Sequence, residues 1–153
     1  MSADARPSTP APTGVVMTVV SSAGFHCRVE HGPSGSLLDT EAPKDNGGTG
    51  SSFSPTDLVG TALASCLLTT MSLVASREGI PFGEARARVE KRMTPPPRRI
   101  GELVLEVDMP AGLSAAHRAR LEEVGRGCPV ARSLHPDVAV PLVFRYPDEP
   151  REG

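Results

Sequence analysis

Two cysteines in this sequence are candidates to perform chemistry together. Cys66 lies in the middle of the apolar run SPTDLVGTALASCLLTTMSLVASREG, residues 54–79, and Cys128 lies well downstream, between Gly127 and Pro129. A thiolate can attack the O–O bond of a peroxide and become a sulfenic acid, and a second thiol can condense with that acid to form a disulfide. The pair therefore has the minimum equipment for reversible peroxide chemistry.

The sequence around Cys128 favours a reactive thiol. This cysteine precedes Pro129 at the point where a loop leads into a short helical turn. Backbone N–H groups at such a junction can point at a sulfur atom and lower the pKa of its thiol. The alternative is that the cysteines act as small apolar side chains, which is the usual state of a buried cysteine. Cys27, on a predicted early strand, fits that description.

Other polar groups give weaker signals. The histidines at His26, His31 and His135 match no zinc-binding pattern, such as paired CxxC, when they are combined with the cysteines. No metal site is therefore expected. Arg98 and Arg99 end a proline turn, where they are either solvated or contact an anion near the site.

The run that holds Cys66 predicts one long helix. Ser54 is suited to the N-cap, Pro55 to the first helical position and Gly79 to the C-terminal cap. Between Asp57 in the first turn and Arg77 in the last turn, the helix carries no charged residue. A helix that is apolar nearly all round is buried on nearly all sides. Two small sheets cannot cover it, so we expect a second copy of the helix, in a symmetric homodimer, to complete its burial.

Strand patterns precede and follow this helix. Three short strands are predicted before it, at residues 14–20, 25–30 and 37–39, followed by a loop over residues 41–52. Two strands that alternate polar and apolar residues are predicted after it, at residues 85–93 and 102–109. A second helix over residues 114–126 and a last strand over residues 138–146 complete the chain. The predicted order is βββ-α-ββ-α-β, an α+β fold.

Length, composition and charge restrict the class of protein. A chain of 153 residues fits one domain, here residues 14–146, with a disordered tail over residues 1–13 and a polar tail over residues 147–153. A net charge of −2 with both signs spread along the chain gives no nucleic-acid footprint. No run of about 18 apolar residues lacks a polar interruption, so no membrane span is expected. The absence of a signal-peptide core predicts a cytoplasmic protein.

The motifs together resemble those of the OsmC/Ohr family of thiol-dependent hydroperoxide reductases. The stretches SPTDLVGTALASC, RRIGELVLEVDMP and CPVARSLHPDV stand in the family's order, and the resemblance covers roughly residues 14–146. It implies an intertwined homodimer, with two long central helices packed between two sheets and with active sites at the dimer interface. It also implies that Cys66 is the peroxidatic thiol, that Cys128 is the resolving thiol, and that no metal or organic cofactor takes part.

The resemblance further implies a function. The substrate would be a small organic hydroperoxide, reduced in defence against oxidative stress, and a dithiol or lipoyl-type compound would regenerate the thiols. An apolar pocket would favour alkyl or lipid hydroperoxides over hydrogen peroxide. The alternative is a binding or sensing module on the same fold, which binds a small electrophile or thiol compound without efficient turnover.

Two positions differ from the best-characterised members of the family. Those members carry Asn-Pro-Glu at the start of the helix, whereas this chain has Ser54-Pro55-Thr56, so that the nearest carboxylate is Asp57. They also place an activating arginine on the early strands, where this chain has only Arg28 between the N-terminal tail and the helix. Arg28 and Asp57 are therefore the candidates to support the thiolate. These departures favour the binding alternative, whereas the two cysteines favour the enzyme.

Overall fold

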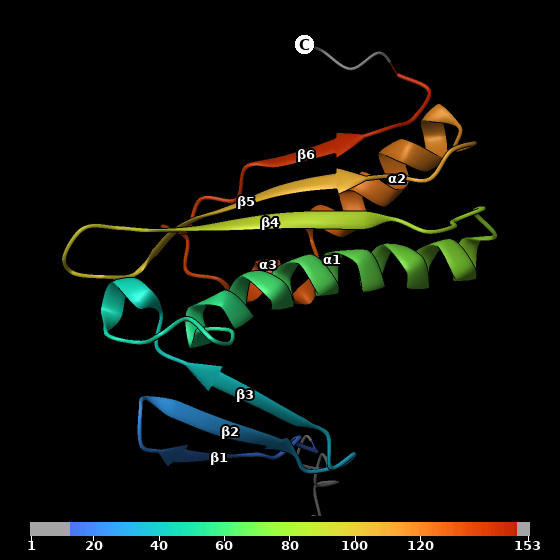
Figure 1. Cartoon of the computed structure of the whole chain (residues 1–153). Coiled ribbons are helices and arrows are strands. Elements are labelled where there is room, and N and C mark those ends of the chain that lie inside the picture. Colours follow the sequence, from blue (N-terminus) through green and yellow to red (C-terminus); the bar gives the residue numbers. More distant parts are fainter. Residues whose placement is uncertain (1–12, 150–153) are drawn as a thin grey trace, which may run out of the picture. The chain divides into compact units, whose positions relative to one another are not determined.

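The computed structural model describes residues 13–149 and divides them into two compact units (Figure 1). The N-terminal unit ends at Phe53, and the C-terminal unit begins at Ser54. The predicted N-terminal tail, except for its last residue, and residues 150–153 of the predicted C-terminal tail lie outside the described residues. Each unit is described by itself below.

The C-terminal unit is built around helix α1 (Pro55–Glu78), which packs against a sheet and two further helices (Figure 1). Strands β4 (Arg86–Met93) and β5 (Ile100–Asp108) are antiparallel, and β6 (Leu142–Arg145) runs parallel to β5 at the edge of the sheet. Helices α2 (Ala115–Arg126) and α3 (Pro129–Ser133) both contact α1. The predicted α+β fold and element order are confirmed, with α3 as a short helix before the last strand.

Local interactions set the two ends of α1 where the sequence predicts them. The Ser54 hydroxyl accepts the N–H of Asp57 at 3.1 Å, and the Asp57 carboxylate accepts the N–H of Ser54 at 2.8 Å, which closes a capping box. At the other end, Gly79 has a φ of 67°, in the left-handed region, and its N–H bonds to the carbonyl of Ala75. The helix therefore begins and ends at defined residues.

The core of this unit lies between α1 and the inner face of the sheet. Six side chains that are at most 2% exposed form its centre: Leu63, Leu67 and Met71 of α1, and Leu103, Leu105 and Val107 of β5. The alternation along β5 sends these apolar side chains to one face, as predicted, and leaves mostly charged residues on the other.

Only one side of α1 is covered within its own unit. Ala62, Ser65 and Thr69 are exposed on the other side, and 51% of Leu73 is exposed. By length and composition alone, α1 could also cross a membrane, since the mean hydropathy of its most apolar window is 1.8. The polar residues within α1 therefore do not by themselves exclude a membrane span. The core helix of a soluble protein, however, meets the same criteria of length and hydropathy. One side of α1 is part of a packed core.

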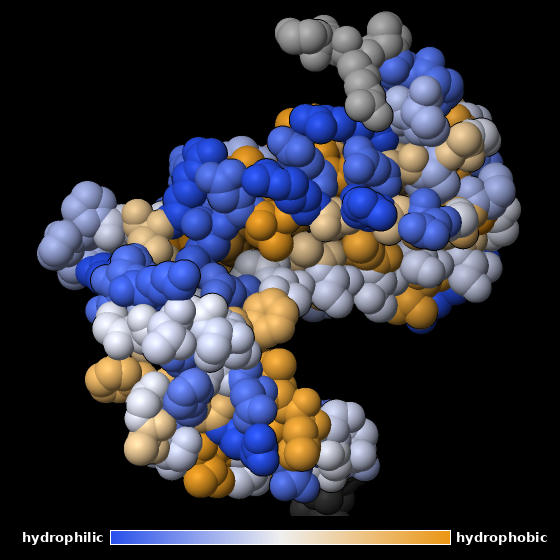
Figure 2. Space-filling view, viewed as in Figure 1, coloured by the Kyte–Doolittle hydropathy of each residue, from blue (hydrophilic) through white to orange (hydrophobic). Residues whose placement is uncertain are grey.

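The N-terminal unit is a three-stranded antiparallel sheet with much of its surface uncovered. Strands β1 (Met17–Ser22), β2 (His26–His31) and β3 (Leu37–Glu41) pair in that order. Every residue of β1 is exposed, and apolar residues reach the surface of this sheet (Figure 2). A sheet of this size with open apolar side chains needs a further layer for stability.

Several predicted elements differ in detail from the structure. The first strand covers Met17–Ser22 rather than residues 14–20, because its pairing with β2 begins opposite His31. The last strand covers only Leu142–Arg145, because Pro141 has no N–H to donate, and the preceding stretch joins β5 through one bridge at Ala139. The predicted loop over residues 41–52 contains a short 3-10 helix, η1 (Lys44–Asn46).

Two buried helical glycines test how closely α1 is packed. A Cβ atom at Gly125 of α2 would lie 3.2 Å from the sulfur of Met71, whereas a Cβ atom at Gly60 of α1 would lie 3.4 Å from Leu103, an ordinary contact. We expect Gly125→Ala to lower the free energy of unfolding by about 1 kcal/mol, because α1 and α2 would have to separate. Gly60→Ala, the matched control, should leave it unchanged or raise it by up to about 1 kcal/mol, because alanine favours the helix. Urea unfolding of both variants measures this, and the opposite order of stability would contradict it.

Candidate active site

Cys66 lies in the middle of α1, at the edge of the core. Its side chain is half-buried and packs against the buried residues of the unit. Its neighbours in the helix are apolar or hydroxyl-bearing, and the charged residues of α1 stand only at the two ends of the helix. Because Cys66 is far from both ends, the backbone N–H groups around it are engaged in the helix itself.

Cys128 is the N-cap residue of α3, and its side chain is fully buried. Burial raises the pKa of the Cys128 thiol, because a low-dielectric surrounding disfavours the charged form. The nearby backbone N–H groups of Ala131 and Val130 act on this pKa in the opposite direction. Burial prevails, so Cys128 is a protonated thiol at neutral pH.

The fold brings these two cysteines together. The side chain of Cys66 lies near that of Cys128, and its proximity raises the pKa of the Cys128 thiol further. This contact arises because α3 packs against α1. Both residues are free thiols, as is Cys27 on β2 of the N-terminal unit. A half-buried thiol in contact with a buried thiol is an arrangement that can form a sulfenic acid and then a disulfide.

A sequence profile of the OsmC-like proteins matches residues 48–142, which is more than half of the chain and includes both Cys66 and Cys128. The chain belongs to the OsmC-like protein family. No match was found among the curated proteins.

Solved structures share the fold of this OsmC-like protein. One, from Psychrobacter arcticus, is described as an osmotic-stress-induced and detoxification-response protein; it is 31% identical, with a TM-score of 0.82 over 90% of this chain and 100% of that chain. An organic hydroperoxide resistance protein from Legionella pneumophila is 20% identical, with a TM-score of 0.71 over 88% of this chain and 98% of that chain. Another, from Elizabethkingia anophelis, is 18% identical, with a TM-score of 0.72 over 90% and 99%. At these low identities, the last two structures show only that they have the same fold as this chain.

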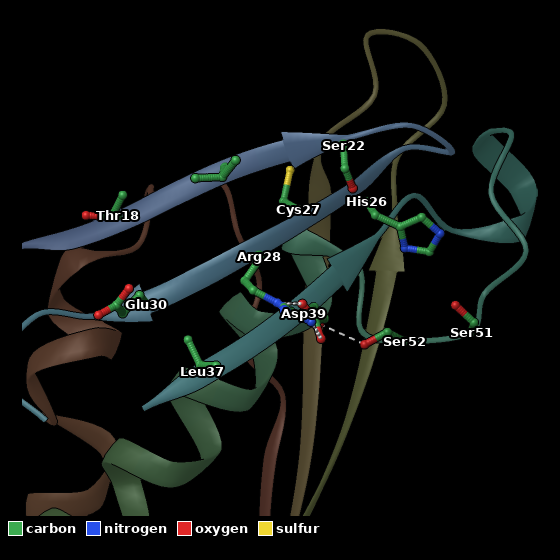
Figure 3. A pocket seen from close by; sticks show the side chains of 11 residues that line it. Thr18, Ser22, His26, Cys27, Arg28, Glu30, Leu37, Asp39, Ser51 and Ser52 are labelled. Carbon is green, nitrogen blue, oxygen red and sulfur yellow. Dashed lines mark hydrogen bonds and ion pairs between the residues drawn. The ribbon is translucent and has the colours of Figure 1, made fainter. Parts of the chain in front are cut away.

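Arg28, the predicted activating arginine, lies on β2 of the N-terminal unit. Its guanidinium donates to both carboxylate oxygens of Asp39 on β3, at 2.9 and 3.2 Å, so that the two side chains point toward one another (Figure 3). These hydrogen bonds hold the pKa of the Asp39 carboxyl below its usual range. In this unit Arg28 therefore has a carboxylate partner on the neighbouring strand.

Asp57, the predicted orienting carboxylate, lies in the C-terminal unit and is also paired. Besides the N–H of Ser54, it accepts a hydrogen bond from the ammonium of Lys91 on β4, with the Nζ and Oδ1 atoms 2.7 Å apart. Burial raises the pKa of Asp57, but the hydrogen bonds from Lys91 and Ser54 outweigh it, so that the net effect lowers this pKa. The structure thus gives Arg28 and Asp57 different partners, one in each unit.

Lys91, which pairs with the predicted site residue Asp57, is a largely covered cation that sequence reasoning missed in this OsmC-like protein. Its side chain is only 15% exposed, and its ammonium also donates to the Thr56 hydroxyl at 2.8 Å and to the Ser54 hydroxyl at 3.2 Å. The sequence contained a signal for this pairing. Lys91 falls on the apolar face of an alternating strand, and a cation on such a face needs a partner of opposite charge.

Glu41 is a second buried charge that the sequence did not reveal. It is 1% exposed, and it accepts the N–H groups of Thr49 and Ser51, at 2.8 and 2.7 Å, together with both of their hydroxyls. The hydrogen bonds from Ser51 and Thr49 lower the pKa of Glu41 to about 2. Its carboxylate therefore holds together the loop that leads into α1.

The histidines make local contacts instead of a shared site. His31 bonds the Ser34 hydroxyl through Nδ1 at 2.6 Å, and His135 lies 3.7 Å from the carboxylate of Asp137. Within residues 13–149, no group of three or more histidine, cysteine, aspartate or glutamate side chains is arranged to hold a metal ion.

Alkylation of the native protein should distinguish the two thiols. Cys128 is fully buried and its pKa is raised, so its thiolate fraction near neutral pH is smaller than that of an ordinary thiol. We expect iodoacetamide to modify Cys66 first, and Cys128 to react only as the pH rises above the ordinary thiol range, about 8.5. Timed pulses at several pH values, read by peptide mass spectrometry, measure the order of reaction. Denatured protein, in which all three cysteines react alike, is the control, and faster labelling of Cys128 at neutral pH would contradict the assignment.

Proposed function

We propose that this protein reduces organic hydroperoxides through a sulfenic acid on Cys66 that Cys128 resolves. The observation that carries the proposal is the proximity of a half-buried thiol, Cys66, to a fully buried thiol, Cys128. The family assignment points to hydroperoxide resistance and oxidative stress, which supports this chemistry. Two relatives in fold, from Legionella pneumophila and Elizabethkingia anophelis, are organic hydroperoxide resistance proteins.

The proposed cycle uses only the two thiols of the protein. The Cys66 thiolate attacks the terminal oxygen of the O–O bond, which yields the Cys66 sulfenic acid and an alkoxide, and the alkoxide takes up a proton from solvent to become the alcohol. Cys128 then condenses with the sulfenic acid, releasing water and leaving a disulfide. A dithiol or lipoyl-type compound reduces this disulfide in the cytoplasm, and no metal or organic cofactor takes part. The apolar residues around Cys66, including Leu63 and Leu67, favour the carbon chain of an organic hydroperoxide over hydrogen peroxide.

A second candidate function is a binding or sensing module on the same fold. The pairing of Arg28 with Asp39 and of Asp57 with Lys91 favours it, because each group that relatives use for activation has another partner here. In that case Cys66 would react with a small electrophile or thiol compound without efficient turnover. In the enzyme, Arg28 would have to leave Asp39 before it could support the thiolate, with Asp57 in the orienting role.

Turnover with a defined peroxide decides between the two candidates. We expect the protein to consume cumene hydroperoxide when dihydrolipoamide is the reductant, and Cys66→Ser to reduce consumption to background, because the attacking sulfur is lost. Cys27→Ser is the matched control and should retain the rate. Mild peroxide without reductant should produce a Cys66–Cys128 disulfide that peptide mapping detects.

Three results would each contradict one part of this proposal. A disulfide that contains Cys27 as the main product would reject the assignment of the two thiols. Stoichiometric modification of Cys66 with no catalytic consumption of peroxide would favour the binding module. An Arg28→Ala variant with an unchanged peroxide rate and unchanged Cys66 alkylation would remove Arg28 from the mechanism.

We also propose that the protein acts as a homodimer in which α1 is covered by its partner. The exposed side of α1 and the exposed valines of the N-terminal sheet are the apolar surfaces that require such cover. We expect an interface larger than about 2,000 Å², the range of obligate dimers. Light scattering at micromolar concentration should give twice the mass of the chain. A stable, soluble monomer would contradict this expectation.

A further inference from the structure

The main chain at the junction between α2 and α3 carries the Cys128 thiol. α2 ends at Arg126, and the chain passes through Gly127 to Cys128, where α3 begins. The N–H group of Cys128 donates to the carbonyl of Gly125 over 3.3 Å, which is longer than a usual N–H···O bond. Within the described residues, the Cys128 side chain caps no N–H group of α3. These local bonds alone hold the peptide group before Cys128 loosely.

Arg132 provides a stronger anchor from one turn further along α3. Its Nε–H group donates to the carbonyl of Gly127 at 2.8 Å, and its backbone N–H group donates to the carbonyl of Cys128 at 3.1 Å. A Cβ atom at Gly127 would lie 3.4 Å from Nη2 of Arg132, so the guanidinium lies directly against the main chain. Gly127 follows the last turn of α2, where carbonyl groups lack partners within the helix and a basic side chain can bond to them.

These two bonds hold the peptide groups on both sides of Cys128. A peptide group is planar, so a fixed Gly127 carbonyl also fixes the N–H group of Cys128. The fixed Cys128 carbonyl restrains the next peptide group in the same way. Together they restrain the φ and ψ angles of Cys128, −62° and 155°, which set the direction of its Cα–Cβ bond. Val130 and Ala131 pack against the core on the inner side of α3, whereas Arg132 acts from the exposed side.

We propose that Arg132 is a positioning residue for the resolving step, and that it directs the Cys128 thiol toward Cys66 through the main chain on both sides of Cys128. This inference rests on the proposed peroxidase function, to which it adds a residue that acts through another. In the step concerned, the Cys128 sulfur bonds to the Cys66 sulfur and the S–O bond of the sulfenic acid breaks. The hydroxyl group leaves with the Cys128 proton as water.

The direction of the thiol matters because a disulfide has narrow geometric limits. The two Cα atoms must lie about 4.4–6.8 Å apart, with Cβ atoms that point toward each other. A displacement of about 1 Å between reacting groups can lower a rate by about 100-fold. Without the Arg132 side chain, the peptide group between Gly127 and Cys128 is free to rotate, and the thiol faces Cys66 for a smaller fraction of the time.

Three variants separate the hydrogen bond of Arg132 from its charge. Arg132→Ala removes both the donor and the charge. Arg132→Gln keeps an N–H donor at the position of Nε but removes the charge. Arg126→Ala is the matched control, because it removes a charge two residues before Cys128 from a side chain whose Cζ atom lies 5.3 Å from the centroid of the Phe144 ring.

A single turnover measures the two chemical steps separately. One equivalent of cumene hydroperoxide is added, and mass spectrometry follows the Cys66 sulfenic acid, trapped with dimedone, and the Cys66–Cys128 disulfide. We expect Arg132→Ala to form the sulfenic acid at the parent rate but the disulfide at least about tenfold more slowly. Arg132→Gln should stay within about threefold of the parent in both steps, because a neutral hydrogen bond replaces a charged one. Arg126→Ala should match the parent.

An unchanged rate of disulfide formation in Arg132→Ala would overturn the inference. Equal slowing of both steps would also overturn it, because a general loss of structure does not spare the first step. The same holds if Arg132→Gln or Arg126→Ala slows disulfide formation as much as Arg132→Ala does, because the charge would then be responsible. If Arg132→Ala does not fold, Arg132→Leu, which keeps an aliphatic side chain without the donor, takes its place under the same expectations.

A second oxidant separates this inference from the proposed function. If the parent forms no sulfenic acid with the peroxide, the proposed function fails, and diamide then replaces the peroxide. Diamide oxidises two neighbouring thiols to a disulfide and is itself reduced to a hydrazine, so it needs no peroxidase activity. Arg132→Ala should form the Cys66–Cys128 disulfide at least about tenfold more slowly than the parent in this reaction as well. Equal rates with diamide would overturn the positioning role.

Discussion

The packing of one face of α1 against β5 and α2 is the interaction on which the candidate site depends. Leu63, Leu67 and Met71 are essentially excluded from solvent, and the capping box at Ser54 fixes where the helix begins. Because the rise and twist of a helix are constant, fixing its start and its buried face also fixes the direction of the Cys66 side chain. Gly125 allows α2 to approach α1 closely, and the chain reaches Cys128 shortly after this point. A change in this packing would separate the two sulfur atoms.

Buried polar groups in both units are compensated by hydrogen bonds, in different ways. Glu41 has four donors from a loop, whereas the Asp57 carboxylate is paired with the Lys91 ammonium at the start of α1. A buried charge without such partners would be costly. Cys128 differs from these groups, because burial outweighs the effect of the nearby N–H groups on its pKa, and the thiol stays protonated.

The uncovered surfaces connect the fold to an oligomeric state. Residues on the exposed side of α1 are small or hydroxyl-bearing, which would let a second helix approach closely, while the N-terminal sheet exposes Val16, Val19 and Val20. Within the described residues, neither of these surfaces is covered by other parts of its own unit. Arg28 and its partner Asp39 lie on neighbouring strands of that sheet.

Patterns in the sequence determined the features that arise from neighbouring residues. The ends of α1 follow from Ser54, Pro55 and Gly79, and the buried face of β5 follows from simple alternation, because capping and strand periodicity act over a few positions. The family could also be recognised, since its motifs lie around the two cysteines. The strand ends at Ser22 and Leu142 were less predictable, because pairing with another strand, and not local preference, sets them.

Only the tertiary structure decided which distant groups meet. The partners of Asp57 and Arg28 are Lys91 and Asp39, and neither choice follows from spacing in the chain, because any nearby charge of opposite sign would satisfy the same carboxylate or guanidinium. The same holds for the state of Cys128. Its sequence context indicates a lowered thiol pKa, but complete burial by the surrounding helices raises it, and burial is a property of the whole fold.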